Sequence, residues 1–314
     1  MKLGFLTACL PQLGLEDLLR WSSKQGFQTI ELAAWPVKTE RDYQARQIDA
    51  ARFGKSDALR IKDLLARYNM EISAMAYYDN NLDPDTKKRK YYHEHLRHVI
   101  NAAALLEVRL VGTFVGARPD RLPGENMKEI GKVFRGIVKY AEDRGVRIMI
   151  ENCPMENWQR FGLPGNFAYS PELWDALFNE VPSKHFGLNF DPSHLYWLGI
   201  DYLRAAKDYA KKIFHAHAKD TEILADGAYR HGLFGKQLDP TPWKSGWWRY
   251  RIPGLGSIDW NRLISTLQES GYDEVLSIEH EDPVWEGSEK KVKKGLSLGL
   301  KHLSHYVLCP PRGR

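Results

Sequence analysis

Four short apolar segments of this chain each carry a side chain that can bind a cation. The segments read Ile148-Met-Ile-Glu, Leu188-Asn-Phe-Asp, Ile213-Phe-His-Ala-His-Ala and Leu276-Ser-Ile-Glu, and their ligand-type residues are Glu151, Asp191, His217 and Glu279. If these side chains meet, they repel one another and shift their pKa values strongly unless a cation lies between them. We therefore predict one divalent metal ion at their meeting point. Three carboxylates and one imidazole, without a thiolate, favour manganese, with magnesium, cobalt or zinc as alternatives.

Such a meeting point requires strands that end at one face of a sheet. Eight stretches have the composition of strands, and helical patterns such as 15–25 and 127–143 separate them. The predicted strands are Leu3–Thr7, Thr29–Ala33, Glu71–Tyr77, Val108–Val115, Arg147–Glu151, Phe186–Asp191, Ile213–Ala218 and Glu274–Glu279. This eightfold alternation predicts an α/β fold with a single (β/α)8 TIM barrel over residues 1–314, whose active site lies at the carboxyl ends of the strands. An open doubly wound sheet is the alternative, but no glycine-rich dinucleotide fingerprint follows the first strand.

The length and composition exclude several classes of protein. The 314 residues can bury the core of one large barrel, and 43% apolar with 27% charged residues is ordinary for a globular chain. No apolar run reaches the roughly 18 residues of a membrane span. The stretch Met1–Leu10 could serve as a short signal segment, but it holds a single lysine and reads equally well as a first strand. We favour the strand, and hence expect a cytoplasmic protein.

Neither the cysteines nor the charges indicate a further function. The three cysteines, Cys9, Cys153 and Cys309, are too widely spaced to suggest a disulfide framework. The net charge of +5 is spread along the chain, and its densest run, Lys87–Lys90, is better explained as a solvated helix start than as a nucleic-acid patch. We expect neither a nucleic acid nor a membrane as a partner.

Two connections are long for a compact barrel, and long loops are usually functional. One follows the second strand, from Trp35 to about Asp57, and the other occupies about 221–260 after the seventh strand. The second holds Trp243, Trp247 and Trp248, whose aromatic faces suit a sugar or a partner subunit in a homo-oligomer or complex. The alternative is that these tryptophans staple the loop to the barrel. We expect this loop to lie over the mouth of the active site.

Five motifs resemble those of the xylose-isomerase-like barrel superfamily of sugar isomerases and epimerases, which also contains inosose dehydratases and endonuclease IV. They are Ile148-Met-Ile-Glu-Asn152, Gly187-Leu-Asn-Phe-Asp-Pro-Ser-His194, His217-Ala-Lys-Asp220, Arg251-Ile-Pro-Gly-Leu-Gly256 with Asp259-Trp260, and Ser277-Ile-Glu-His-Glu281. The resemblance extends from about Met1 to about Trp285. It implies the same barrel and the same four metal ligands.

The resemblance also implies roles for residues around the ion. Glu151 and Glu279 would double as the catalytic acid and base. His194 and Arg251 would contact substrate oxygens. Lys219, as a cation suited to holding anionic or hydroxyl oxygens, and Trp197 are further candidates for substrate binding. Lys219 could instead only form an ion pair with its neighbour Asp220. His215 lies on the strand face of His217 but one layer deeper, which favours a role in the core.

The predicted chemistry is proton transfer at a carbon next to a carbonyl. A metal ion that contacts the carbonyl and hydroxyl oxygens stabilises the enediolate, and two opposed carboxylates supply the base and the acid. We expect a metal-dependent isomerase or epimerase that acts on a keto-sugar or related polyol. The alternative is a lyase that uses the same proton abstraction to dehydrate an inosose or to cleave a 3-keto-glycoside, including a C-glycoside.

Two other functions are less compatible with the sequence. A nuclease like endonuclease IV needs three zinc ions and extra histidines, whereas Tyr77-Tyr78 and Thr113-Phe114 follow the third and fourth predicted strands here. A non-catalytic sugar-binding protein would not need the complete set of metal ligands.

Overall fold

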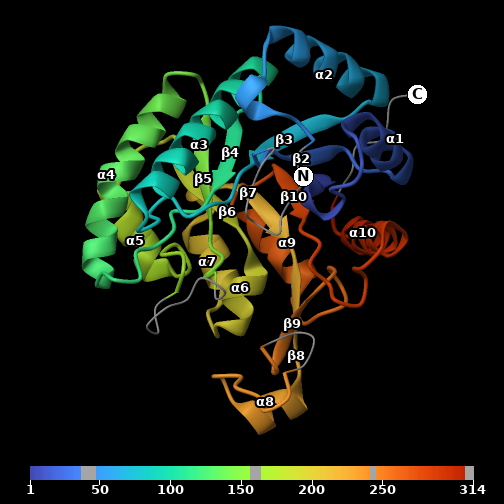
Figure 1. The fold of residues 1–314 in the computed structure, drawn as a ribbon. Helices are drawn as coiled ribbons and strands as arrows, with labels where there is room; N and C mark the ends of the chain where they lie inside the picture. Colours follow the sequence, from blue (N-terminus) through green and yellow to red (C-terminus); the bar gives the residue numbers. More distant parts are fainter. Residues whose placement is uncertain (37–46, 156–163, 241–244, 308–314) are drawn as a thin grey trace.

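An eight-stranded parallel sheet forms the centre of the chain (Figure 1). The computed structural model describes residues 1–36, 47–155, 164–240 and 245–307. The strands are β1 (Lys2–Phe5), β2 (Thr29–Ala33), β3 (Glu71–Ala76), β4 (Leu110–Thr113), β5 (Arg147–Glu151), β6 (Phe186–Phe190), β7 (Ile213–Ala218) and β10 (Val275–Ile278). Their order in the sheet is β1–β10–β7–β6–β5–β4–β3–β2. The sheet is a nearly closed barrel surrounded by helices, which confirms the predicted (β/α)8 fold.

The barrel closes between β1 and β2, the two ends of the sheet. Within the described residues these strands share one isolated bridge, between Leu6 and Glu31. The backbone N–H of Gln28, just before β2, also donates to the carbonyl of Leu3 at 3.0 Å. The seven other neighbouring pairs form parallel ladders. We call the weakly paired β1–β2 junction the seam.

The helices of the described residues lie between or after the strands along the chain and, apart from α8, cover the outside of the sheet (Figure 1). They are α1 (Leu15–Gln25), α2 (Lys55–Tyr68), α3 (Thr86–Leu106), α4 (Pro123–Glu142), α5 (Pro171–Glu180), α6 (Pro192–Trp197), α7 (Tyr202–Asp208), α8 (Ala225–His231), α9 (Trp260–Glu269) and α10 (Glu289–Leu303), with short 3-10 helices at Thr7–Cys9, Ala50–Arg52 and Ala210–Lys212. None of them combines the length and the apolar composition that a bilayer span requires.

Local chemistry explains where the elements begin and end. The helix predicted at 15–25 is α1, and it stops at Gly26, whose φ of 107° is left-handed. The helix predicted from 127 begins earlier, at Pro123, because proline suits a first turn and the Glu125 carboxylate accepts the N–H of Leu122 at 3.0 Å. The strand predicted from Val108 starts later, because the N–H of Val108 donates to Ala103 at the end of α3.

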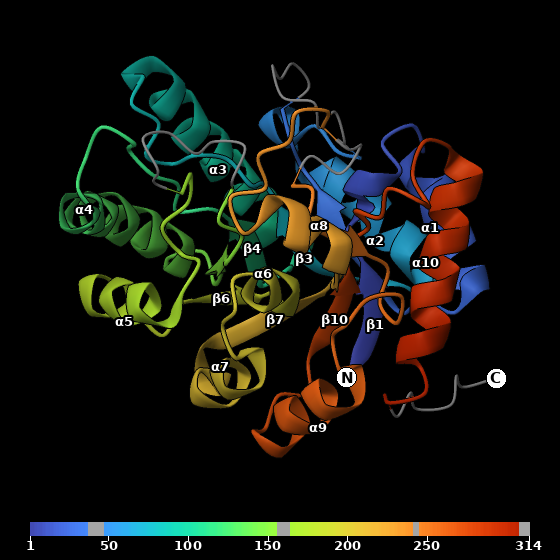
Figure 2. The same cartoon turned by 90° about the horizontal axis from the view of Figure 1, so that it is seen from below.

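An antiparallel pair of strands leaves the barrel after β7. Strand β8 (Asp220–Ile223) begins two residues beyond the end of β7 and pairs with β9 (Trp248–Arg251). Helix α8 lies at the far end of this pair, away from the sheet (Figure 1), and in the view from below it lies in front of the barrel strands (Figure 2). We call the described residues of this segment, 220–240 and 245–251, the arm. The long loop expected after the seventh strand therefore contains regular elements, and because it follows the end of β7 it leaves from the carboxyl-end face. Trp243 lies outside the described residues.

Aromatic packing holds the arm against the end of helix α6. The indole of Trp248 stacks on that of Trp197, with ring centroids 4.5 Å apart and an interplanar angle of 6°. Trp247 packs edge-on against the same two rings. Both arm tryptophans are buried. This packing supports the role of a staple for Trp247 and Trp248.

Truncation of the stacked indole should destabilise the protein. We expect Trp248→Ala to lower the free energy of unfolding by about 3 kcal/mol, since replacing a buried tryptophan by alanine typically costs 3–5 kcal/mol. Denaturant unfolding measures the change. The matched control is Tyr229→Ala on α8, whose side chain is 91% exposed and should contribute less than about 0.5 kcal/mol. Equal effects of the two substitutions would show that the stack does not anchor the arm.

Candidate metal centre and active site

The four predicted metal ligands come together at the carboxyl ends of neighbouring strands. Glu151 is the last residue of β5, Asp191 follows β6, His217 lies near the end of β7, and Glu279 follows β10. One ligand atom from each of the four lies within 4.8 Å of the others. Glu151, Asp191 and His217 are buried, and Glu279 is slightly exposed. The sheet order explains this convergence, because β5, β6, β7 and β10 are consecutive.

Two imidazoles face the carboxylates. His217 Nδ1 lies 3.0 Å from Glu279 Oε2 and 3.4 Å from Glu151 Oε1. His194 Nε2, from α6, lies 3.3 Å from both Glu151 Oε1 and Asp191 Oδ2. His194 therefore borders the same cluster as the four candidate ligands.

Lys219 is a buried cation at the centre of the acidic groups. Its Nζ lies 2.7 Å from Glu279 Oε2, 3.0 Å from Glu281 Oε2 and 3.3 Å from Asp191 Oδ2. Although burial opposes the charged form, these three carboxylates raise the pKa of Lys219 well above its ordinary value.

The alternative partner considered for Lys219 has a different role. Asp220 accepts hydrogen bonds from the N–H of Gly254, the N–H of Ile258 and the indole N–H of Trp260, each at 2.9 Å. Gly254 adopts a left-handed φ of 87° that glycine tolerates best. Asp220 thus holds the turn that follows the arm, and the alternative that Lys219 pairs only with Asp220 is wrong, because Lys219 pairs with Glu279, Glu281 and Asp191.

The protonation of the cluster follows from burial and from the neighbouring charges. Burial raises the pKa of Glu151 to about 8, and the charge of Glu279 adds to this effect. Burial likewise raises the pKa of Asp191. Burial opposes ionisation of Glu279 too, but Lys219 and His217 hold its pKa well below the ordinary value. The acidic side chains therefore outnumber the cations that compensate them.

This donor set fits a divalent cation. Oxygen-rich sites with one imidazole suit manganese and related ions, and a cation would remove the repulsion among the carboxylates. Asp191 Oδ2 is fully buried and accepts no well-aligned hydrogen bond from the described residues, although Lys219 Nζ and His194 Nε2 each lie 3.3 Å away. A buried carboxylate oxygen with an unused lone pair is the atom that a metal ion would take as a ligand.

Comparison with known proteins assigns the chain to a family. The profile described as xylose isomerase-like TIM barrel matches residues 19–302. The chain belongs to this family. It is 27% identical over 309 residues to the uncharacterized protein YfiH of Bacillus subtilis, covering 90% of this chain and 93% of that one. It is 24% identical over 288 residues to an inosose isomerase of Bacillus licheniformis, covering 89% and 88% of the two chains.

Solved structures of similar fold include the IolI protein with a bound zinc atom. That structure has a TM-score of 0.70 and 21% identity, and the match covers 98% of this chain and 100% of IolI. At this identity the likeness concerns the fold. Inosose dehydratases and a D-psicose 3-epimerase also show sequence or structural similarity. The xylose isomerase-like family thus provides isomerase, dehydratase and epimerase relatives for this chain.

In this member of the family, the arm contributes a side chain to the site. The hydroxyl of Tyr250 on β9 lies 2.8 Å from His194 Nδ1, so it forms a hydrogen bond with the ring nitrogen that faces away from the carboxylates. The Tyr250 ring lies 4.4 Å from Lys219 Nζ and packs edge-on against Trp248. Tyr250 therefore connects the arm to two of the candidate substrate-binding residues, and Trp248 connects it to a third, Trp197.

Arg251 occupies a different environment from the other candidates. Its guanidinium donates to Asp282 Oδ2 at 3.0 Å and to Glu222 Oε2 at 2.5 Å. Asp282 also accepts the N–H of Ile252 at 3.0 Å. These bonds attach the arm to the segment after β10, so contact between Arg251 and a substrate remains a prediction.

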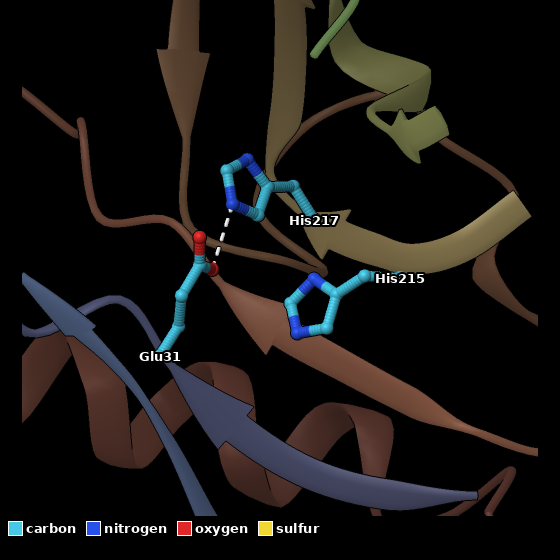
Figure 3. Close-up of side chains that lie close together, drawn as sticks. All are labelled: Glu31, His215 and His217. Atoms are coloured by element: carbon cyan, nitrogen blue, oxygen red, sulfur yellow. Dashed lines mark hydrogen bonds and ion pairs between the residues drawn. The ribbon is translucent and has the colours of Figure 1, made fainter. Parts of the chain in front are cut away.

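The sequence analysis missed Glu31, a fully buried carboxylate on β2. Its Oε2 lies 2.8 Å from His217 Nε2 (Figure 3). Burial opposes ionisation of Glu31, yet the charge of His217 and their hydrogen bond lower its pKa below the ordinary value. The available signal was a glutamate in the middle of the otherwise apolar stretch Thr29-Ile-Glu-Leu-Ala33.

Proposed function

We propose that this chain is a divalent-metal-dependent isomerase or epimerase that moves a proton at a carbon next to the carbonyl of a keto-sugar or related polyol. The observation that carries the proposal is the convergence of Glu151, Asp191, His217 and Glu279 within 4.8 Å at the carboxyl ends of four consecutive strands. We propose these four residues as the ligands of one ion, with manganese as the expected metal. The family and its inosose isomerase relative support this assignment.

The bound ion would act as a Lewis acid that stabilises negative charge on substrate oxygens. Glu151 and Glu279 are the proposed acid and base, because they lie on β5 and β10, on opposite sides of Asp191 and His217 in the sheet. One carboxylate takes the proton from the carbon, the electron pair moves onto the carbonyl oxygen, and the other carboxyl returns a proton to complete the transfer. A carboxylate has two oxygens, so Glu151 and Glu279 could each hold the ion with one oxygen and exchange a proton with the other.

The remaining polar groups would orient the substrate. Lys219 and His194 present N–H groups beside the carboxylates, where they can donate to hydroxyl or carbonyl oxygens. We propose that the arm forms one wall of the site, since Tyr250 contacts His194 and Trp248 stacks on Trp197. Flat aromatic surfaces suit the C–H faces of a sugar ring.

A lyase is the second candidate. An inosose dehydratase of Geobacillus thermodenitrificans is 30% identical over 120 residues, and that match spans 38% of this chain and 39% of the relative. Elimination needs the same base and, in addition, an acid that protonates the leaving group. The hydrogen-bonded His194 and Tyr250 side chains place a second proton-carrying pair beside the carboxylates.

Solvent isotope exchange tests the proposed reaction. In D₂O with manganese and a panel of keto-sugars, inososes and 3-keto-glycosides, we expect deuterium at the α-carbon of the product or of recovered substrate. Mass spectrometry and NMR measure the exchange. Exchange with an unchanged carbon–oxygen skeleton supports the isomerase, whereas loss of water or of an aglycone supports the lyase. Turnover with complete retention of the original hydrogen would contradict both and indicate a hydride shift.

A further inference from the structure

A second cluster lies directly below the proposed metal centre, in the barrel interior. Glu31 projects from β2, and His215 and His217 project from β7 (Figure 3). The three residues are buried, and their ligand-type atoms lie within 4.8 Å of one another. His217 belongs to both clusters, since its Nδ1 faces Glu279 and Glu151 while its Nε2 faces Glu31.

The lower cluster is a hydrogen-bond network rather than a second ion site. Both ring nitrogens of His215 have partners: Nδ1 lies 3.0 Å from Asn189 Oδ1, and Nε2 lies 3.1 Å from Ser73 Oγ. An ion at this position would have to break these bonds or the bond between His217 and Glu31. His215 therefore packs as a satisfied core residue.

Glu31 is held in place by three donors from three strands or strand ends. Tyr78, after β3, donates its hydroxyl to Oε1 at 2.8 Å, and Ser277 on β10 donates its hydroxyl to Oε2 at 3.0 Å. His217 Nε2 is the third group, at 2.8 Å from Oε2. Ser277 is also the residue opposite His217 in the ladder between β10 and β7. These contacts fix the carboxylate before any ligand arrives.

The position of Glu31 decides which nitrogen of His217 carries the proton. A carboxylate only accepts hydrogen bonds, so the nitrogen facing it must donate. Asn189 Nδ2 lies 2.9 Å from the same nitrogen and 2.8 Å from the Tyr78 hydroxyl, which accepts one of its two protons. Nδ1 also faces carboxylates, so without a cation it would carry a proton as well. A metal ion would take the place of that proton and bind the Nδ1 lone pair, while Glu31 keeps the proton on Nε2.

We infer that Glu31 is a positioning residue of the metal centre, which holds His217 in the Nε2–H form and orients its Nδ1 toward the ion. This inference rests on the proposed metal site. Carboxylate partners of metal-binding histidines fix the ring orientation and raise its basicity, and their removal typically lowers metal affinity by about 10- to 100-fold. Because Glu31 would act through His217 alone, its removal should weaken binding without removing a ligand.

Titration of the purified protein with Mn²⁺ by calorimetry tests the inference. We expect one ion per chain in the wild type and an affinity lower by about 10- to 100-fold in Glu31→Ala. In Glu31→Gln the amide oxygen still accepts the Nε2 proton without the negative charge, so a smaller loss of about fivefold is expected. Ser73→Ala is the matched control, because it removes a bond to His215 in the same layer and should leave the affinity unchanged.

A spectroscopic readout separates positioning from general stability. In ¹⁵N NMR of the Mg²⁺-loaded protein, we expect the His217 proton on Nε2 in the wild type and in Glu31→Gln, and a mixture of tautomers in Glu31→Ala. Unchanged Mn²⁺ affinity and tautomer in both variants would overturn the inference and leave the metal centre intact. Two ions per wild-type chain, one of them lost in His215→Ala, would also overturn it. No Mn²⁺ binding by the wild type would instead overturn the proposed function, and the inference with it.

Discussion

Glutamine in place of Glu279 should reduce turnover by about 10² to 10⁴-fold, the usual loss when a general acid or base is removed. Glu151→Gln should have an effect of the same order. In both variants the amide keeps the size of the side chain but can neither take nor return the proton. The assay needs saturating manganese, so that a weaker ion site is not mistaken for a lost base, and binding of substrate should remain measurable.

Glu281→Gln is the matched control for this experiment. Glu281 also contacts Lys219, at 3.0 Å, but it does not belong to the group of four candidate ligands. The same chemical change two residues along the chain should therefore alter turnover by less than about tenfold, the cost of one hydrogen bond. If Glu281→Gln is as damaging as Glu279→Gln, the acid–base assignment is wrong and a charged network around Lys219 is what turnover requires.

Replacing His217 by alanine should abolish stoichiometric metal binding. The substitution removes the single imidazole ligand and also leaves the Glu31 carboxylate without its partner. Metal analysis after dialysis against manganese should give one ion per wild-type chain and almost none in the variant. The melting temperature of the wild type should rise with manganese, since an ion at 100 times its dissociation constant stabilises the folded state by about 2.7 kcal/mol, whereas that of the variant should not.

His215→Ala provides the comparison for His217→Ala. Both residues are fully buried histidines on the same face of β7, but His215 bonds only to Asn189 and Ser73 among the partners described here. His215→Ala should lose stability yet retain one ion per chain. Full metal occupancy in His217→Ala would remove His217 from the ligand set.

The fold and the convergence of four ligand-type residues could be predicted because each depends on local signals. Glu151, Asp191 and Glu279 stand where apolar strand patterns stop, and in a parallel barrel such positions share one face. Strand boundaries were less predictable, as Val108 shows: its side chain suits a strand, but its N–H completes the end of α3.

Other features depend on contacts between distant parts of the chain. Glu31 and His217 are 186 residues apart in the sequence, and nothing near Glu31 indicates its partner. The arm was expected as a loop because its polar and aromatic composition lacks the alternation of a strand. Arg251 was expected at the substrate, but its bonds to Glu222 and Asp282 could not be anticipated, since they form only once β8 and β9 pair.

The proposed metal centre should affect the local stability of the seam. Backbone pairing around the barrel is weakest between β1 and β2. Local opening of the barrel should start there, where the fewest amides are paired. The hydrogen bond from Glu31 on β2 to His217 on β7 crosses the barrel interior and links strands on the two sides of the seam. An ion that holds His217 in place should also stabilise the seam through this bond. Amide hydrogens along β1 and β2 should therefore exchange more slowly when the proposed centre holds a metal ion.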